Sequence, residues 1–185
     1  MPWQNRNRTS QRTQVLDDPQ ISDISKYFIL GRIVYKWAEG SSGAVWSTVM
    51  QPTTPRDFLK VALQRLTAAE EIMQTLRLTL EAQYIGGYSV ECSLKALVME
   101  RTAEPDRPAI LDQITHGAAY HRADVLLEML RNRGVFLTVE LAKRMRRFDW
   151  TTDLRYEIGR KDTGETNGML RTARAIYEWV EEQMP

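Results

Sequence analysis

The stretch from Leu80 to Arg101 constrains the fold of this chain most. It reads LEAQYIGGYSVECSLKALVMER, and its apolar side chains cover most of a helical circumference. A helix that is apolar nearly all round is buried inside a protein instead of lying on its surface. The adjacent Gly86 and Gly87 let neighbouring backbones approach closely, which offsets the roughly 1 kcal/mol that each glycine costs inside a helix. We therefore expect a central helix that other helices pack against closely.

Two charged residues, Glu91 and Lys95, interrupt the apolar surface of the second half of this stretch. They stand four positions apart with the glutamate first, which is the favourable order for an ion pair along a helix. We therefore predict a buried polar pair, in or beside the core.

Composition and charge set broad limits. The chain has 185 residues, of which 43% are hydrophobic and 26% charged, and these values fit one globular domain with an extension. The formal net charge of +1 neither requires nor excludes a nucleic-acid partner, because local patches matter more than the sum. The single cysteine excludes an internal disulfide and favours a reducing compartment.

Neither a membrane span nor a secretory signal is expected. No apolar run reaches the length of about 18 residues that a spanning helix needs, and the start of the chain lacks the apolar region of a signal peptide. We therefore expect a cytoplasmic location.

Three regions follow one another. Residues 1–20 form a polar basic tail with Arg6, Arg8 and Arg12, expected to be flexible or, alternatively, an arm that touches nucleic acid or a partner subunit. Residues 21–54 form an N-terminal extension with one predicted helix, and residues 55–185 form the main domain.

The main domain reads as helices throughout. Thr54 is the predicted N-cap of a long helix with Pro55 at its first position, and Gly134 ends a later helix. Thr138 starts another helix, with Val139 among its inward residues. The predicted helices are 55–76, 80–101, 110–118 leading into 121–132, one from 138, and 166–184. Without strand alternation or an internal repeat, this pattern predicts an all-α antiparallel bundle of four to five helices.

The sequence offers no metal or cofactor motif. His116 and His121 are five apart, about 140° around a helix, so they do not share a face, and a zinc site needs three or four ligands at tighter spacing. No glycine-rich phosphate loop is present. Cys92 lies in the apolar helix and is expected to be an inert core thiol. We expect neither a metal nor a cofactor.

A basic segment from residue 143 to residue 161 is the main candidate for binding. This segment contains seven basic and three acidic residues, and Trp150 and Tyr156 lie between them in the sequence. Basic groups and aromatic faces together suit a phosphate backbone and stacked bases. The alternative is a solvated helix face with Trp150 and Tyr156 packed inward. The candidate nucleic-acid-binding residues are Lys143, Arg144, Arg146, Arg147, Arg155, Arg160 and Lys161.

The order of these motifs resembles the HEPN family (higher eukaryote and prokaryote nucleotide-binding). Residues 65–101 resemble the opening of a HEPN domain, and the E-x-x-L-K-A-L core of that family matches residues 91–97. Later matches follow in family order and extend the resemblance over residues 55–184. These are His121 to Leu127 for H-D-L-x-x-L-L, with Asp124 three residues after the histidine instead of adjacent, Leu154-Arg155-Tyr156 for L-R-Y, and Leu170 to Met184 for the closing helix.

The resemblance implies a bundle of four or five helices that is usually dimeric. Many members are metal-independent ribonucleases with an R-x(4–6)-H motif, and others bind RNA or nucleotides or pair with a nucleotidyltransferase in toxin–antitoxin systems. Arg155 can stand for the arginine, but residues 159–162 contain no histidine. The motif therefore does not carry the ribonuclease chemistry over to this chain.

We expect a homodimer that binds RNA or a nucleotide through Arg155, Tyr156 and the basic helix. The resemblance places it beside a protein partner, such as a nucleotidyltransferase, in a bacterial toxin–antitoxin or phage-defence system. One alternative is a metal-independent endoribonuclease with a non-standard site, in which Tyr156 or His121 supplies the proton step. Another is a non-catalytic structural or antitoxin-like subunit.

Overall fold

The computed structural model describes residues 29–30, 33–34, 50–116 and 121–185. The chain divides into two units, Met1–Val49 and Met50–Pro185. The predicted basic tail and most of the predicted N-terminal helix lie outside the described residues.

The described part of the first unit is a pair of short antiparallel strands. β1 (Ile29–Leu30) pairs with β2 (Ile33–Val34), with Leu30 opposite Ile33. The helix predicted in this extension is wrong at these four positions. Ile and Val favour strands.

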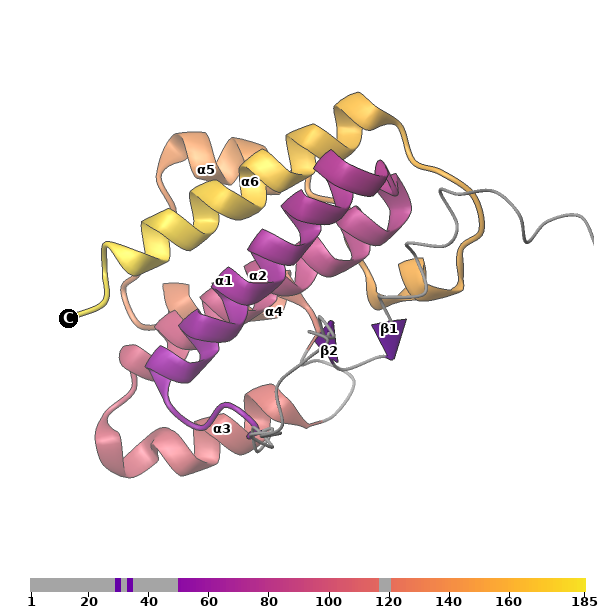
Figure 1. Ribbon diagram of the computed structural model, residues 1–185. Coiled ribbons are helices and arrows are strands. Elements are labelled where there is room, and N and C mark those ends of the chain that lie inside the picture. The colour runs from indigo at the N-terminus through magenta and orange to yellow at the C-terminus, as the bar shows by residue number, and fades with distance from the viewer. Residues whose placement is uncertain (1–28, 31–32, 35–49, 117–120) are drawn as a thin grey trace, which may run out of the picture. The chain divides into compact units, whose positions relative to one another are not determined.

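The second unit is all-α, as the sequence predicts (Figure 1). Its described residues form six α-helices instead of four to five, because the chain between α2 and α5 forms two separate short helices. The helices are α1 (Pro55–Glu71), α2 (Thr79–Glu100), α3 (Arg107–Thr115), α4 (Ala123–Arg131), α5 (Val139–Met145) and α6 (Thr163–Glu181). Short turns of other helix types cover Ile72–Leu76, Glu104–Asp106 and Thr152–Tyr156.

Local sequence sets the ends of α1 as predicted. Thr54 and Asp57 form a reciprocal capping box, in which the Asp57 amide donates to Thr54 Oγ1 over 3.2 Å, and Pro55 occupies the first helical position. At the other end Arg77 has a left-handed backbone with φ 53°. This residue reverses the chain, so that α2 returns antiparallel along α1.

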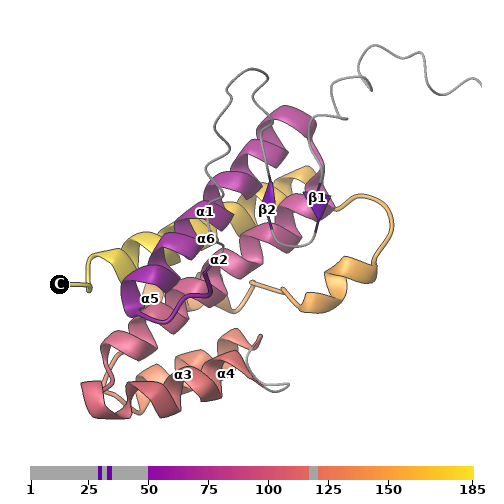
Figure 2. The ribbon, with the colours of Figure 1, turned by 60° about the horizontal axis from the view of Figure 1, so that its bottom comes forward.

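α2 is the central helix. It packs along α1 and α6 (Figure 2) and also contacts α4. The glycine pair explains the close approach. A Cβ on Gly86 would lie 2.6 Å from Cδ2 of Leu170, and a Cβ on Gly87 would overlap the indole of Trp150. The predicted tight packing around both glycines is confirmed.

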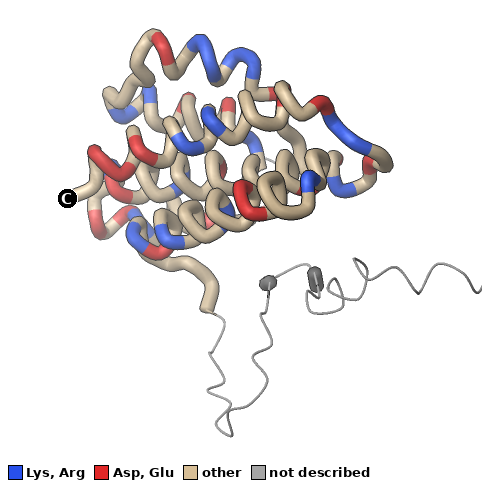
Figure 3. The backbone as a smooth tube through the Cα atoms, turned by 45° about the horizontal axis from the view of Figure 1, so that its top comes forward, with Lys and Arg blue, Asp and Glu red and all other residues tan. Residues whose placement is uncertain are grey.

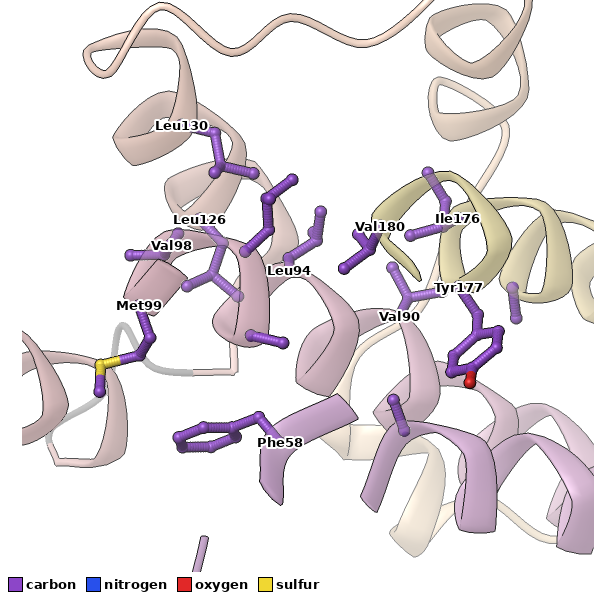
Figure 4. Close-up of a cluster of buried hydrophobic side chains, with 14 of the residues drawn as sticks. Phe58, Val90, Leu94, Val98, Met99, Leu126, Leu130, Ile176, Tyr177 and Val180 are labelled. Carbon is purple, nitrogen blue, oxygen red and sulfur yellow. The ribbon is translucent and has the colours of Figure 1, made fainter. Parts of the chain in front are cut away.

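The largest hydrophobic cluster takes buried side chains from all six helices, and most of them come from four (Figure 4). α2 supplies its centre, α1, α4 and α6 supply most of the surrounding side chains, and α3 and α5 add Ile114 and Leu141. The labelled members are Phe58, Val90, Leu94, Val98, Met99, Leu126, Leu130, Ile176, Tyr177 and Val180. One inward prediction is wrong, since Val139 is 74% exposed. α5 buries Leu141, and a residue two positions earlier lies about 200° away around the helix.

Candidate functional site

A row of polar and aromatic side chains follows one face of α2. Its buried end is the predicted pair, in which Lys95 Nζ donates to Glu91 Oε1 over 2.5 Å. The two side chains are only 5% and 4% exposed. Buried charges are tolerated where they are paired and hydrogen-bonded, so this pair belongs to the core, as expected.

His121 joins this row from the segment before α4. Its Nδ1 lies 3.0 Å from Glu91 Oε2, so one carboxylate contacts both Lys95 and His121. A carboxylate only accepts hydrogen bonds, which assigns the imidazole proton to Nδ1 in this contact. The histidine side chain is 26% exposed and therefore lies at the edge of the core, within reach of solvent.

Tyr88 stands at the centre of an aromatic cluster. Its ring makes edge-on contacts with Tyr84, His121 and Trp150 at centroid distances of 5.2, 5.8 and 5.0 Å. The hydroxyl groups of Tyr84 and Tyr88 are 3.1 Å apart. Burial, and then the Tyr84 hydroxyl, raise the pKa of Tyr88, while the positive charge of Arg155 acts in the opposite direction. Tyr88 thus contacts His121 directly and is influenced by the charge of Arg155.

Residues 150–161, here termed the anchored loop, are fixed to α2 at both ends. At the first end Trp150 is buried and donates from Nε1 to the carbonyl oxygen of Tyr84 over 3.1 Å. At the other end the Thr79 hydroxyl donates to the carbonyl of Lys161 and accepts from its amide, at 2.8 and 2.9 Å. Leu154 is buried between the two anchors.

The outer side of the anchored loop presents Arg155 and Tyr156. Tyr156 is 73% exposed, and the Arg155 guanidinium carbon lies 4.7 Å from the centroid of its ring. The two aromatics of the basic segment therefore behave differently. Trp150 packs inward, as the alternative reading has it, whereas Tyr156 faces solvent beside a cation.

The structure divides the seven basic residues into separate groups. Lys143, Arg144 and Arg147 line a pocket between α5 and α6, whereas Arg146 lines a different pocket that Leu127 and Leu130 of α4 also border. The other three lie in the anchored loop, where Lys161 pairs with Glu157 over 2.5 Å and this bond raises the pKa of Lys161. Figure 3 shows basic residues both on α5 and in the loop before α6.

Sequence reasoning selected Glu91 as the partner of Lys95 and His121 as a candidate proton carrier, but it missed that Glu91 and His121 contact each other beside Tyr88. It also missed Tyr84 and Tyr88 as site residues. Their spacing of four was the available signal, since residues at i and i+4 share a helix face. No local signal links Glu91 to His121, which are thirty positions apart.

Comparison of the chain with protein-family models, with curated proteins and with solved structures gave no match. The HEPN resemblance therefore remains a prediction. Within the described part of the chain, no three or more His, Cys, Asp or Glu residues are grouped as metal ligands. No helix in residues 50–116 or 121–185 is long and apolar enough to cross a membrane.

Proposed function

We propose that this chain binds RNA through the outer side of the anchored loop. The observation that carries the proposal is the exposed Tyr156 ring with the Arg155 guanidinium 4.7 Å from its centroid. An exposed aromatic face stacks on a base without regard to sequence, and a neighbouring arginine pairs with phosphate. The anchors at Trp150 and Thr79 hold this pair in place, which lowers the entropy lost on binding.

An extended strand suits this surface better than a small nucleotide. Small molecules bind in concave sites that bury most of their surface. Neither of the two pockets bordered by α5 is lined by Arg155 or Tyr156. The loop carries three basic and two acidic residues, so its electrostatic attraction for RNA is modest and stacking supplies much of the affinity.

A metal-independent endoribonuclease is the second candidate, and the bond between His121 and Glu91 favours it. A carboxylate that orients an imidazole prepares it to move a proton, here from the attacking ribose 2′-hydroxyl. Arg155 acts electrostatically on Tyr88, whose ring also contacts His121. An arginine in such a site neutralises the charge that develops on the scissile phosphate.

The cellular setting is proposed from the HEPN resemblance alone. On that basis the chain forms a homodimer and acts beside a second protein, such as a nucleotidyltransferase, in bacterial toxin–antitoxin or phage defence. The molar mass of the purified chain by light scattering tests the dimer directly, since a monomer at all concentrations contradicts it.

Binding of a short labelled single-stranded RNA tests the primary proposal. Tyr156→Ala and Arg155→Ala should each weaken binding about tenfold, given 1–3 kcal/mol per stacked base. Tyr156→Phe should retain the affinity, because it keeps the ring. Arg131→Ala is the matched control, since Arg131 is exposed at the end of α4 and makes no ion pair with a described residue. Undetectable binding by the wild type overturns the proposal.

Incubation of the same RNA in EDTA separates the two candidates. Cleavage by the wild type that disappears in His121→Ala, with binding retained, supports the ribonuclease. Binding without cleavage supports a binding protein. A cleavage rate that is equal in the wild type and in His121→Ala eliminates His121 as the proton carrier.

A further inference from the structure

The pocket between α5 and α6 has a volume of about 580 Å³, is lined mostly by polar and charged residues, and does not include Arg155 or Tyr156. Gln83 of α2 contributes to its lining and is only 2% exposed. Its amide nitrogen donates to Glu165 Oε1 over 3.2 Å and to Thr166 Oγ1 over 3.1 Å. Phe148 and Met169 supply apolar wall. Pockets of 300–1,000 Å³ are typical of small-ligand sites.

Positive charge around this pocket exceeds the negative charge available to neutralise it. One of the carboxylates is already paired, because Glu140 bonds to Arg144 over 3.4 Å. The Glu165 carboxylate accepts from the neutral amide of Gln83 and keeps its charge, so Lys143, Arg147 and Arg171 outnumber Asp149 and Glu165 by one. None of the remaining three cations makes an ion pair with a described residue. The lining comprises the basic residues Lys143, Arg144, Arg147 and Arg171 and the acidic residues Glu140, Asp149 and Glu165.

We propose that this pocket binds a compact diphosphate group. Lys143 lies in the last turn of α5 and Arg147 in the turn directly after it, and Arg171 lines the same pocket from α6. Cations from the α5 region and from α6 surround one pocket. This arrangement suits a ligand whose negative charges lie close together. An RNA backbone instead carries one charge per nucleotide along its length. The arginine forks bind phosphate oxygens in pairs, and the space beside Phe148 and Met169 accepts an organic group attached to the diphosphate.

Titration calorimetry of the full chain with inorganic pyrophosphate tests this site. Lys143→Gln, Arg147→Gln and Arg171→Gln should each weaken binding about tenfold, the loss expected for one charge-assisted hydrogen bond. Arg146→Gln is the matched control, because Arg146 directly precedes Arg147, is also exposed and lines the other pocket. Its affinity for pyrophosphate should equal that of the wild type.

Three outcomes would overturn the proposal. These are undetectable pyrophosphate binding by the wild type, binding no tighter than that of sulfate, and equal weakening by Arg146→Gln, which would mean general attraction to a basic surface. Melting curves of the variants establish that each is folded. The titration contains no RNA, so its result is independent of whether the anchored loop binds RNA.

Discussion

His121 lies with Nδ1 3.0 Å from Oε2 of Glu91, and this contact joins the start of α4 to the middle of α2. The same carboxylate accepts from Lys95 through its other oxygen. Lys95 in the core and the partly exposed imidazole of His121 therefore share one acidic group. A change in Glu91 acts on the stability of the bundle and on the orientation of His121 together.

Glu91→Ala should destabilise the protein by about 3–5 kcal/mol, the range for breaking a buried ion pair from one side. The substitution removes the carboxylate that both Lys95 and His121 contact. The free energy of unfolding in urea measures this loss.

The double variant Glu91→Leu/Lys95→Met is the informative companion, because exchanging both partners of a buried pair for apolar groups is often neutral or stabilising. It should therefore be clearly more stable than Glu91→Ala. A loss below about 1 kcal/mol in Glu91→Ala would place this pair among weak surface ion pairs.

Gly87→Ala should destabilise the protein by about 1–3 kcal/mol, the usual cost of overpacking, although alanine favours a helix. The added methyl overlaps the Trp150 indole, and Trp150 is held by its bond to the Tyr84 carbonyl. Gly86→Ala is the matched control, since its nearest neighbour is the end of a flexible leucine side chain. Equal unfolding free energies for the two variants would contradict the claim that the Trp150 side chain is held rigidly against Gly87.

Thr54→Ala should lower stability at neutral pH by about 1 kcal/mol, as expected for a lost N-cap. The Thr54 side chain is the main cause that lowers the pKa of Asp57 below 3.8. The stabilisation by this carboxylate is therefore present above pH 3.8 and is lost as the pH falls through the lower pKa of the folded state. The stability difference between wild type and Thr54→Ala should shrink in acid. A difference that is constant with pH would contradict the role of the Asp57 carboxylate.

Cys92 should react slowly with a thiol reagent such as DTNB at pH 8. Its side chain is half-buried, and burial, with a smaller contribution from the negative charge of Glu91, raises its pKa to about 12. Only the thiolate is nucleophilic, so the rate should rise sharply when the protein is unfolded in urea. Equal rates in native and unfolded protein would show that the thiol is accessible and ionised in the fold.

The sequence predicted those features of the fold that depend on residues close to one another along the chain. The start of α1 at Thr54 and the bond between Glu91 and Lys95 follow from spacings of four residues or fewer, and the burial of α2 follows from the apolar character of one continuous stretch. They could be predicted because helix caps and i,i+4 pairs form within one or two turns.

Contacts between distant segments could not be predicted in this way. The contact of His121 with Glu91 depends on how α4 packs on α2. The basic residues from 143 to 161 form one cluster in the sequence. In the structure Trp150 is buried against Gly87, and this buried residue separates the basic residues of α5 from those of the anchored loop. The spacing of residues along the sequence does not show that this separation occurs.

The salt dependence of RNA binding tests the RNA proposal most directly. Arg155 and Arg160 are the loop cations without an ion pair to a described residue. Two phosphate contacts on a single strand correspond to a slope of about −1.4 in log K against log salt. We expect that slope for the wild type, a slope shallower by about 0.7 for Arg155→Ala, and an unchanged slope with about tenfold weaker binding for Tyr156→Ala. An RNA affinity that does not change with salt concentration, or that is unchanged in Tyr156→Ala, would contradict the proposal that the anchored loop is the RNA site.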